Sequence, residues 1–410
     1  MRLIHTSDWH LGQYFFTKSR AAEHQAFLRW LIEQIEQQRV DALIVAGDLF
    51  DTGSPPSYAR ELYNRFVVEL QHTGCQLVVL GGNHDSVATL NESRELLSCL
   101  NTTVIANAQS DIGQQILVLN QRDGQPGAVL CAIPFLRPRD LTTSRAGESG
   151  GQKQQALQEA IAQHYQQLYQ AACARRDELG LTLPIVATGH LTTMGVTTSD
   201  SVRDIYIGTL DAFPAQAFPP ADYIALGHIH RAQNVAKSEH IRYSGSPIPL
   251  SFDELGKPKS VFMVDFADGA LQQVTALDIP NFQPMQLIKG DLAQIEQQLR
   301  QFADYQGALP VWLDIEVATQ DYLSDIQRRI QRLADQLPVE VVLLRRSKEQ
   351  RRQALERQDK ETLNELSVDE VFERRLAQET EITEPRQQRM RQMFHQVVEA
   401  VRHNDEEPTQ

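Results

Sequence analysis

Five short clusters of polar residues contain side chains that commonly bind metal ions, and each follows a run of apolar residues directly. They are Asp8-Trp9-His10, Gly47-Asp48-Leu49-Phe50-Asp51, Gly82-Asn83-His84-Asp85, Gly189-His190 and Gly227-His228-Ile229-His230. The clusters offer imidazole, carboxylate and amide groups without a thiolate. That mixture fits a site for Mn²⁺, Fe²⁺ or Zn²⁺ better than it fits a structural zinc site. The sequence therefore predicts a metal centre.

The size of the ligand set predicts two ions. Four histidines, two or three aspartates and one asparagine are too many for one ion and suit two, provided that one carboxylate bridges them. Asp48 stands in the middle of the set and is the natural bridge. Two ions about 3.5–4 Å apart can activate a water and stabilise the oxygens of a phosphate under in-line attack. The predicted chemistry is hydrolysis of a phosphate ester.

These clusters need rigid elements to position them. Residues 2–6, 41–46 and 76–80 read as short strands, and residues 22–36 and 58–70 as helices, because their apolar residues have the matching periods. Strand and helix alternate, so we expect an α/β core. Strands hold ligands firmly, and a glycine just before a ligand allows close approach of backbone and substrate.

The rest of the chain predicts two further parts. Residues 137–155 read as a loop and 154–176 as a polar helix, and strands return at 184–188, 223–226 and 261–266. From 282 to 346 the pattern becomes strand, helix 292–302, strand 311–317, helix 322–333 and strand 339–344, typical of a small α/β cap. We expect a catalytic domain at 1–280, a capping domain at 281–345 and a helical tail at 346–410.

The tail is polar and locally basic. Residues 341–360 hold seven Lys/Arg and three Asp/Glu, which suits either a solvated linker or contacts with phosphates. A capping-box pattern begins at Ser367. An apolar stripe follows, which docks either on its own domain or on a partner; it consists of Met390, Met393, Phe394, Val397, Val398 and Val401.

Composition bounds the function. The 410 residues carry a net charge of −14, which argues against nucleic-acid binding unless a local site is positive. Two divalent ions contribute a charge of about +4, and the carboxylates of Asp8 and Asp48 cancel two of these charges. The predicted centre therefore stays positive and attracts phosphate. The four cysteines lie far apart and read as reduced thiols. Apolar runs are too short to span a bilayer and no export signal is visible, so we expect a cytoplasmic protein.

The five motifs, read as Asp8-x-His10, Gly47-Asp48, Gly82-Asn83-His84-Asp85, Gly189-His190 and Gly227-His228-x-His230, resemble the calcineurin-like metallophosphoesterase family. The flanking residues and the layout of the whole chain are most similar to the members of this family that serve as nuclease subunits in bacterial DNA-repair complexes. The resemblance implies a two-sheet α/β/β/α sandwich with a small α/β capping domain and a helical C-terminal tail.

The resemblance also implies residue roles. Asp8, His10, Asp48 and His230 would hold one ion, and Asp48, Asn83, His190 and His228 the other, with Mn²⁺ as the expected metal. His84 would not bind metal but would assist the leaving oxygen, with Asp85 orienting it. Asp51 has either a direct role or a turn-capping role. Protein phosphatases of the family commonly place an Arg-Gly pair after the second motif, whereas this chain has Asp51-Thr52-Gly53.

The implied activity is 3′→5′ exonuclease action on duplex DNA, dependent on ATP hydrolysis by a coiled-coil ATPase partner, and endonuclease action on single strands and hairpins. The implied assembly is a homodimer within a heterotetramer at the nucleoid. Helices 58–70 and 87–100 serve either core packing or the dimer contact. Two alternatives stay open: a phosphodiesterase for small substrates, whose chemistry needs neither cap nor tail, and a non-catalytic scaffold, for which loss of ligands would be expected.

Overall fold

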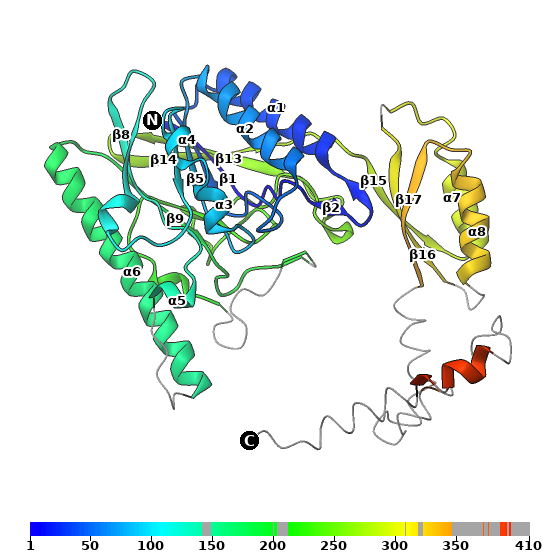
Figure 1. Ribbon diagram of the computed structural model, residues 1–410. Coiled ribbons are helices and arrows are strands. Elements are labelled where there is room, and N and C mark those ends of the chain that lie inside the picture. Colours follow the sequence, from blue (N-terminus) through cyan, green and yellow to red (C-terminus); the bar gives the residue numbers. More distant parts are fainter. Residues whose placement is uncertain are drawn as a thin grey trace, which may run out of the picture. The chain divides into compact units, whose positions relative to one another are not determined.

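The computed structural model describes residues 1–141, 149–199, 201–202, 212–307, 309–318 and 323–346, together with 372, 376, 386–391 and 393–394. By contacts, the chain divides into one unit of residues 1–316 and 323–345 and a second unit of residues 317–322 and 346–410. The first unit contains the sheets and helices that position the polar clusters (Figure 1).

The first sheet has six strands. Their order is β14 (Ala270–Asp278), β13 (Ser260–Ala267), β1 (Arg2–Thr6), β4 (Ala42–Ala46), β5 (Gln76–Leu80) and β6 (Thr102–Ile105). Strands β1, β4, β5 and β6 are parallel, whereas β13 and β14 are antiparallel to their neighbours. Helices α1 (Ala21–Gln37) and α2 (Ser57–Gln71) bury apolar stripes, including Phe27 and Phe66, in the core shared with this sheet.

The second sheet repeats this arrangement. Its order is β11 (Gln233–Asn234), β12 (Ile241–Tyr243), β10 (Tyr223–Gly227), β9 (Ile185–His190), β8 (Pro126–Cys131) and β7 (Ile116–Asn120). The long helix α6 (Gly150–Leu179) packs Ile161, Tyr165 and Leu168 against it in a separate core. The polar residues of α6 face away from this contact, which explains how so polar a sequence forms a stable helix.

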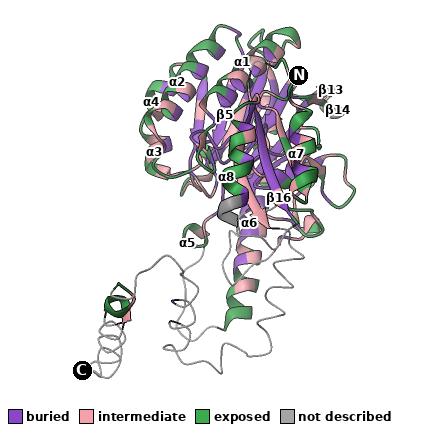
Figure 2. Cartoon of the chain, turned by 90° about the vertical axis from the view of Figure 1, so that its right-hand side faces the viewer, coloured by how far each residue is buried: buried purple, intermediate pink, exposed green. Residues whose placement is uncertain are grey.

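A third core lies between the two sheets. It joins residues such as Ile44 and Val78 of the first sheet to Leu130 and Ala225 of the second, all fully buried. The layers therefore run helix, sheet, sheet, helix, which confirms the predicted α/β/β/α sandwich. Figure 2 shows the strands largely buried and the outer faces of α2, α3 and α4 exposed.

The predicted strand–helix pattern of the cap is present. Strands β15 (Met285–Gly290), β16 (Val311–Val317) and β17 (Val339–Arg346) form a three-stranded sheet in that order, with helices α7 (Leu292–Arg300) and α8 (Leu323–Ala334) between them in the chain. Trp312 stacks on Phe15 of the hairpin formed by β2 (Tyr14–Phe15) and β3 (Lys18–Ser19), with ring centroids 5.8 Å apart. Asp314 is fully buried and pairs with Arg345 at 2.7 Å.

Several sequence-based expectations need correction. The expected helix 87–100 is two short helices, α3 (Val87–Asn91) and α4 (Arg94–Ser98). The expected loop 137–155 contains α5 (Pro138–Leu141) and the start of α6, because Ser149 and Gln152 form a capping box that begins the helix at Gly150. Strands β6, β7, β8 and β14 were not predicted. Three short 3₁₀ turns complete the described elements: Ile112–Gln115, Ala215–Ala217 and Phe252–Glu254.

Most of the tail lies outside the described residues, including the basic stretch after Arg346, the capping box at Ser367 and the three valines of the apolar stripe. Residues 386–391, 393 and 394 are helical. Met390 and Met393 are exposed there, and Phe394 stacks on Phe372 with centroids 3.9 Å apart. Among the described helices, none combines the length and apolar character that crossing a bilayer would require.

Candidate metal centre

The five polar clusters meet at one edge of the sandwich. His190 and Gly227 are the last residues of β9 and β10, and Asp8, Asp48 and Asn83 follow β1, β4 and β5 by two or three residues. The carboxyl ends of parallel strands lie at the same edge of a sheet, and both sheets contribute to this one. Residues more than 200 positions apart in the chain are therefore in contact there, as Asp8 and His228 show below.

The backbone at this edge is strained. Four of the clustered residues have positive φ although they are not glycine: Asp8 at 54°, His10 at 46°, Asp48 at 51° and His228 at 92°. Each such conformation costs of order 1–3 kcal/mol and persists only where the surrounding structure enforces it. Strain of this kind gathers at functional sites, because it aims side chains that regular backbone would direct elsewhere.

Two glycines make the close packing feasible. A β-carbon on Gly82 would lie 2.1 Å from Asp48 Oδ1, and one on Gly227 would lie 2.0 Å from the carbonyl oxygen of Ala46. Any side chain at either position would push the two sheets or the Asp48 loop apart. The expectation that glycine allows close backbone approach beside the clusters holds at both positions.

One group of candidate ligands consists of Asp8, His10 and His230, whose ligand atoms lie within 4.8 Å of one another. Asp8 is fully buried, and its carboxylate accepts hydrogen bonds from Ser7 Oγ and from the backbone N–H of His228, the latter at 2.9 Å. His230 Nε2 faces Asp8 Oδ1 at 4.0 Å. Two imidazoles and one carboxylate thus point at a common space from both sheets.

The second group consists of Asp48, His190 and His228, with Asn83 beside it. Asn83 Oδ1 lies 2.9 Å from His190 Nε2 and 3.2 Å from His228 Nδ1. The other ring nitrogen of His190, Nδ1, donates to the carbonyl oxygen of Ala46 at 2.9 Å. Because Nδ1 makes that bond, Nε2, which faces Asn83 and Asp48, is the ring nitrogen that an ion could bind once its proton is displaced.

Asp48 lies between the two groups. Its Oδ2 is 3.6 Å from His10 Nε2 and 3.2 Å from His190 Nε2, while its Oδ1 accepts the backbone N–H of His84 at 2.9 Å. Burial alone would raise the pKa of Asp48, but His190 and His10 outweigh burial and hold the pKa well below its ordinary value. Asp48 is thus the carboxylate that faces both groups.

His84 is partly exposed beside these groups. Its ring lies edge-on to that of His10, with centroids 4.8 Å apart, and its Nδ1 donates to the carbonyl oxygen of Asp51 at 2.7 Å. Asp51 also directs Oδ1 toward His10 Nδ1 at 3.2 Å. Asp51 therefore contacts two of the clustered histidines, a more specific position than a turn cap.

The hydrogen bonds of the Asp85 carboxylate come from backbone N–H groups. Its buried carboxylate accepts the N–H groups of Leu49, Phe50 and Gly82 at 3.1, 2.9 and 2.8 Å. These bonds tie the loop after β4 to the loop after β5. Burial, together with the nearby charge of Asp48, raises the pKa of Asp85 to about 6 despite the three N–H donors. These contacts of Asp85 are with the backbone of the loops that carry Asp48 and Asn83, and the expected role of Asp85 in orienting His84 stays a prediction.

The donor set fits divalent ions. Among the described residues, His10 Nε2 and His228 Nε2 are buried polar atoms with no hydrogen-bond partner. Buried polar atoms in native proteins are nearly always satisfied, so unsatisfied ring nitrogens on two of the clustered histidines fit a site that takes ions. Imidazole nitrogens with carboxylate and amide oxygens are suited to Mn²⁺, Fe²⁺ or Zn²⁺.

Comparison with known proteins decides the family. Residues 1–232 match the Calcineurin-like phosphoesterase family, and residues 281–380 match the family described as Type 5 capsule protein repressor C-terminal domain, SbcD_C. The SbcD subunit of the nuclease SbcCD from Escherichia coli K12 is 64% identical over 394 residues, 96% of this chain and 97% of that protein. The chain belongs to the SbcD family.

More distant members of the SbcD family also match. The SbcD subunit of the Rhodobacter capsulatus nuclease SbcCD is 36% identical over 68% of this chain and 70% of its own length. The Bacillus subtilis protein of the same name is 28% identical over 79% of this chain and 81% of its own. The resemblance drawn from the five motifs is thereby confirmed: the chain is an SbcD-family member with a calcineurin-like phosphoesterase domain, a metal-dependent phosphodiester hydrolase of the nuclease type.

Some residues that support the site had no signal in the sequence. Ser7 Oγ and Ser244 Oγ lie 2.8 Å apart behind Asp8, and Ser201 contacts His230. Arg137 donates to the carbonyl oxygen of Asp85 at 3.0 Å. Serine and arginine are common throughout the chain, so only their contacts distinguish these four. By contrast, Trp9 is fully buried between Phe27 and Phe66 and packs in the core rather than lining the site.

Proposed function

We propose that this SbcD-family chain is a two-metal nuclease that hydrolyses DNA phosphodiesters, acting as a 3′→5′ exonuclease on duplex ends and as an endonuclease on single strands and hairpins. The observation that carries the proposal is the pair of adjoining ligand groups, with Asp48 of one group also facing His10 of the other. The substrate class, nucleic acid, is taken from the relatives, which are named as nucleases. Its cellular setting would be the nucleoid, in double-strand-break and hairpin processing.

The proposed ion ligands follow the two groups. Asp8, His10, Asp48 and His230 would hold one ion, and Asp48, Asn83, His190 and His228 the other, with Mn²⁺ as the physiological metal. When bound, the two ions supply a nucleophilic water and neutralise the charge that develops on the phosphate oxygens. Asp48 would support both ions, since its Oδ2 faces His10 of one group and His190 of the other.

His84 is proposed to protonate the leaving oxygen or to stabilise the transition state. It is partly exposed and adjoins His10, so a phosphate held by the ligand groups would lie beside its ring. The bond from Nδ1 to Asp51 fixes the ring orientation, and imidazole exchanges protons near neutral pH. Asp85 contributes by fixing the loop that carries Asp48 to the loop that carries Asn83.

Metal affinity is expected to rise with pH between pH 7 and 9. Burial lowers the pKa of His190, but the charge of Asp48 and its hydrogen bond raise it more, to about 9. An ion that binds Nε2 must displace that proton, so affinity increases about tenfold per pH unit until His190 is neutral in the free protein. Calorimetric Mn²⁺ titrations in buffers of different ionisation enthalpy measure both affinity and proton release. Equal affinity at pH 7 and 9, with no proton released, would contradict the expectation.

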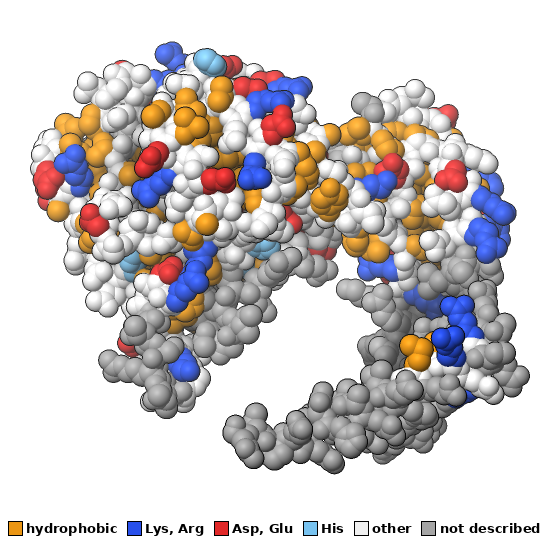
Figure 3. Space-filling model, viewed as in Figure 1, with side chains coloured by type: hydrophobic (Ala, Val, Ile, Leu, Met, Phe, Trp, Pro, Cys, Tyr) orange, Lys and Arg blue, Asp and Glu red, His pale blue; other side chains and the backbone are white. Residues whose placement is uncertain are grey.

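The capping domain, residues 281–345, is proposed to contact DNA. Helix α8 exposes Arg328, Arg329 and Arg332, although Arg329 also pairs with Glu296 at 2.6 Å. On the face in Figure 3, Lys and Arg side chains lie along the outer edge of the cap, with acidic side chains on the same domain. A local basic surface of this kind binds phosphates in spite of a net charge of −14.

The tail, residues 346–410, is proposed to dock a coiled-coil ATPase of the SbcC type. The relatives are named as one component of a nuclease, SbcCD, whose name implies a second component, SbcC. Met390 and Met393 are exposed, and flexible methionine side chains suit a partner groove. ATP hydrolysis by that partner would then open access to duplex DNA.

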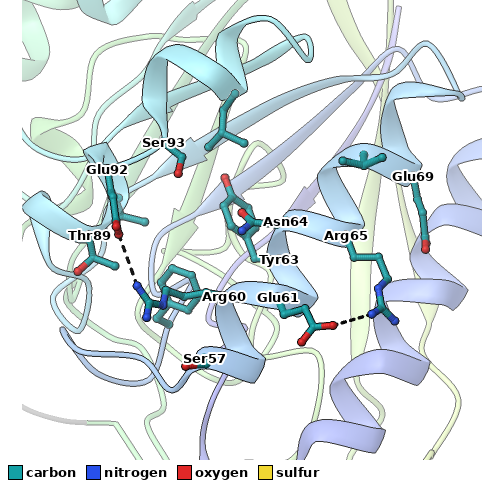
Figure 4. A pocket seen from close by; sticks show the side chains of 14 residues that line it. Ser57, Arg60, Glu61, Tyr63, Asn64, Arg65, Glu69, Thr89, Glu92 and Ser93 are labelled. Atoms are coloured by element: carbon teal, nitrogen blue, oxygen red, sulfur yellow. Dashed lines mark hydrogen bonds and ion pairs between the residues drawn. The ribbon is translucent and has the colours of Figure 1, made fainter.

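A homodimer within the resulting heterotetramer is proposed to form through α2, α3 and α4. A cavity of about 680 Å³ lies between α2 and the two short helices, with Phe50, Tyr63 and Leu97 among its lining residues. Ion pairs Arg60–Glu92 and Arg65–Glu61 lie beside it (Figure 4). Val68 of α2 and Leu96 of α4 are 48% and 66% exposed, more than is usual for residues of this type.

Replacing Leu96 with aspartate should therefore convert the dimer to monomers of 46.4 kDa. A charge in the centre of an apolar contact is left without a partner and costs several kcal/mol. Light scattering after size exclusion measures the mass directly. Leu181→Asp is the matched control, because Leu181 is also exposed but lies two residues after the end of α6. A dimer that survives Leu96→Asp, or a monomeric parent chain, would exclude this interface.

The nuclease proposal is tested with end-labelled linear and hairpin DNA. In Mn²⁺ we expect cleavage that chelation abolishes, and much faster turnover of DNA than of a small chromogenic phosphodiester. The opposite preference would favour a small-molecule phosphodiesterase. Absence of bound metal at micromolar Mn²⁺ would favour a scaffold. Duplex DNA that is cut only after an SbcC-type ATPase and ATP are added would support the partner-dependent form of the proposal.

A further inference from the structure

The ring nitrogen of His230 that faces away from the candidate ions is bound to a serine. His230 Nδ1 lies 2.7 Å from Ser201 Oγ, and Ser201 Oγ lies 2.6 Å from Glu254 Oε1. His230 and Glu254 are both 3% exposed. A chain of hydrogen bonds therefore joins a buried carboxylate to a candidate metal ligand through one hydroxyl.

Glu254 is itself held from several sides. Its Oε2 accepts Lys259 Nζ at 2.5 Å and the backbone N–H of Leu250 at 3.1 Å, and its Oε1 also accepts Ser199 Oγ at 2.9 Å. Lys259 Nζ donates in addition to the carbonyl oxygen of His230 at 3.0 Å. The ammonium keeps the carboxylate charged, and the same ammonium fixes the backbone that carries the imidazole.

Counting protons assigns the direction of each bond. A charged carboxylate only accepts, so the Ser201 hydroxyl, with its single proton, donates to Glu254. Its lone pairs then face His230 Nδ1, which must donate to them. If Ser201 instead donated to Nδ1, two oxygens would face each other at 2.6 Å with no proton of Ser201 between them. Neutral His230 therefore carries its proton on Nδ1, and the lone pair lies on Nε2, the atom that faces Asp8.

We propose that Glu254, acting through Ser201, is a positioning residue that sets the tautomer of His230 so that Nε2 binds the ion held with Asp8 and His10. The inference rests on the metal centre under the proposed function and extends it beyond the ligands. Outer partners of this kind commonly change metal affinity roughly 10–100-fold. Neither Ser201 nor Glu254 belongs to the five motifs, and they lie 29 and 24 positions from His230 in the chain.

The test is Mn²⁺ binding to the full chain, followed by the electron paramagnetic resonance signal of free Mn²⁺. The unsubstituted chain should bind two ions. Ser201→Ala should lower the affinity for one ion roughly 10–100-fold and leave the affinity for the other ion unchanged. Glu254→Gln should do the same, because its amide donates to Ser201 and turns the hydroxyl proton toward Nδ1. Ser201→Thr keeps the hydroxyl and should restore affinity.

Matched controls separate positioning from general damage. Ser238→Ala removes a serine contact to the Nδ1 of His240, a histidine outside the site, and should bind both ions normally. Nitrogen-15 spectra of labelled histidine in the metal-free chain should show His230 protonated at Nδ1, and at Nε2 in Glu254→Gln. The inference would be overturned if Ser201→Ala bound both ions with wild-type affinity, or if it lost affinity for both ions equally. An unchanged His230 tautomer in Glu254→Gln would overturn it as well. Fewer than two ions in the unsubstituted chain would overturn the metal centre itself.

Discussion

Replacing His84 with alanine is expected to lower DNA cleavage about 10²–10⁴-fold while two Mn²⁺ ions remain bound. The ring adjoins His10 without being required by either group of ligands, and its proton-bearing Nδ1 is fixed by the carbonyl oxygen of Asp51. Removing it deletes a proton donor and leaves the ligand atoms in place. Cleavage of end-labelled DNA gives the rate, and the free-Mn²⁺ signal gives the number of ions.

Two variants sharpen this result. His84→Asn keeps a donor for the Asp51 carbonyl but cannot exchange a proton near pH 7, so it should be almost as inactive as the alanine variant. His72→Ala removes an exposed histidine at the end of α2 and should cleave normally. Loss of an ion in His84→Ala would show that His84 is a ligand: it also lies within ligand distance of His10 and Asp48. Equal cleavage by parent and variant would remove His84 from the chemistry.

Replacing Asp48 with alanine is expected to release both ions and to abolish cleavage. Its Oδ2 faces His10 on one side and His190 on the other, and its Oδ1 also holds the backbone N–H of His84. The change removes a negative charge from between two cations. One ion would keep only neutral ligands and the other only the carboxylate of Asp8 beside two imidazoles, so both should bind far more weakly. Metal content after gel filtration at micromolar Mn²⁺ measures the outcome.

The controls for Asp48 separate the effect of losing its negative charge from the effect of losing its hydrogen bond to the His84 N–H. Asp48→Asn retains an oxygen for the His84 N–H, so it should keep the loop in place yet bind neither ion tightly. Asp51→Asn changes a carboxylate that faces the Nδ1 of His10, and should weaken binding by no more than roughly 10–100-fold. One fully occupied ion site in Asp48→Ala would exclude the bridging role.

The strand–helix alternation of the first domain and the ordered metal motifs were predictable, because both depend on local pattern. Apolar runs that end in Asp8, Asp48 and Asn83 mark buried strands followed by ligand loops, and the structure has strands there. Strand β14 was not predictable in the same way, because polar residues interrupt its apolar ones and it becomes a strand through pairing with β13. Strands β7 and β8 do contain apolar runs, at 116–119 and 128–131, but no metal-binding motif follows either of them.

The expected helix 87–100 shows a second limit. Its apolar residues suit one continuous helix, yet the structure has α3 and α4, with Leu90 and Leu97 packed into the same core. Both residues are buried in either arrangement, so their spacing could not distinguish the two. Helix α4 packs against β6, a strand that was not predicted, so nothing in the sequence indicated the neighbour that fixes this part of the chain.

The sequence by itself determined which side chains can bind metal, their order along the chain and the family to which they belong, because residue type and local spacing carry that information. Only the tertiary structure decided that Asp48 faces both groups, that Asp85 holds backbone N–H groups and that Glu254 reaches His230 through Ser201. Apart from the bond between Asp85 and Gly82, those contacts, and the one from Asp8 to His228, join residues 24 to 220 positions apart. Their geometry follows from the packing of two sheets face to face, which no local pattern encodes.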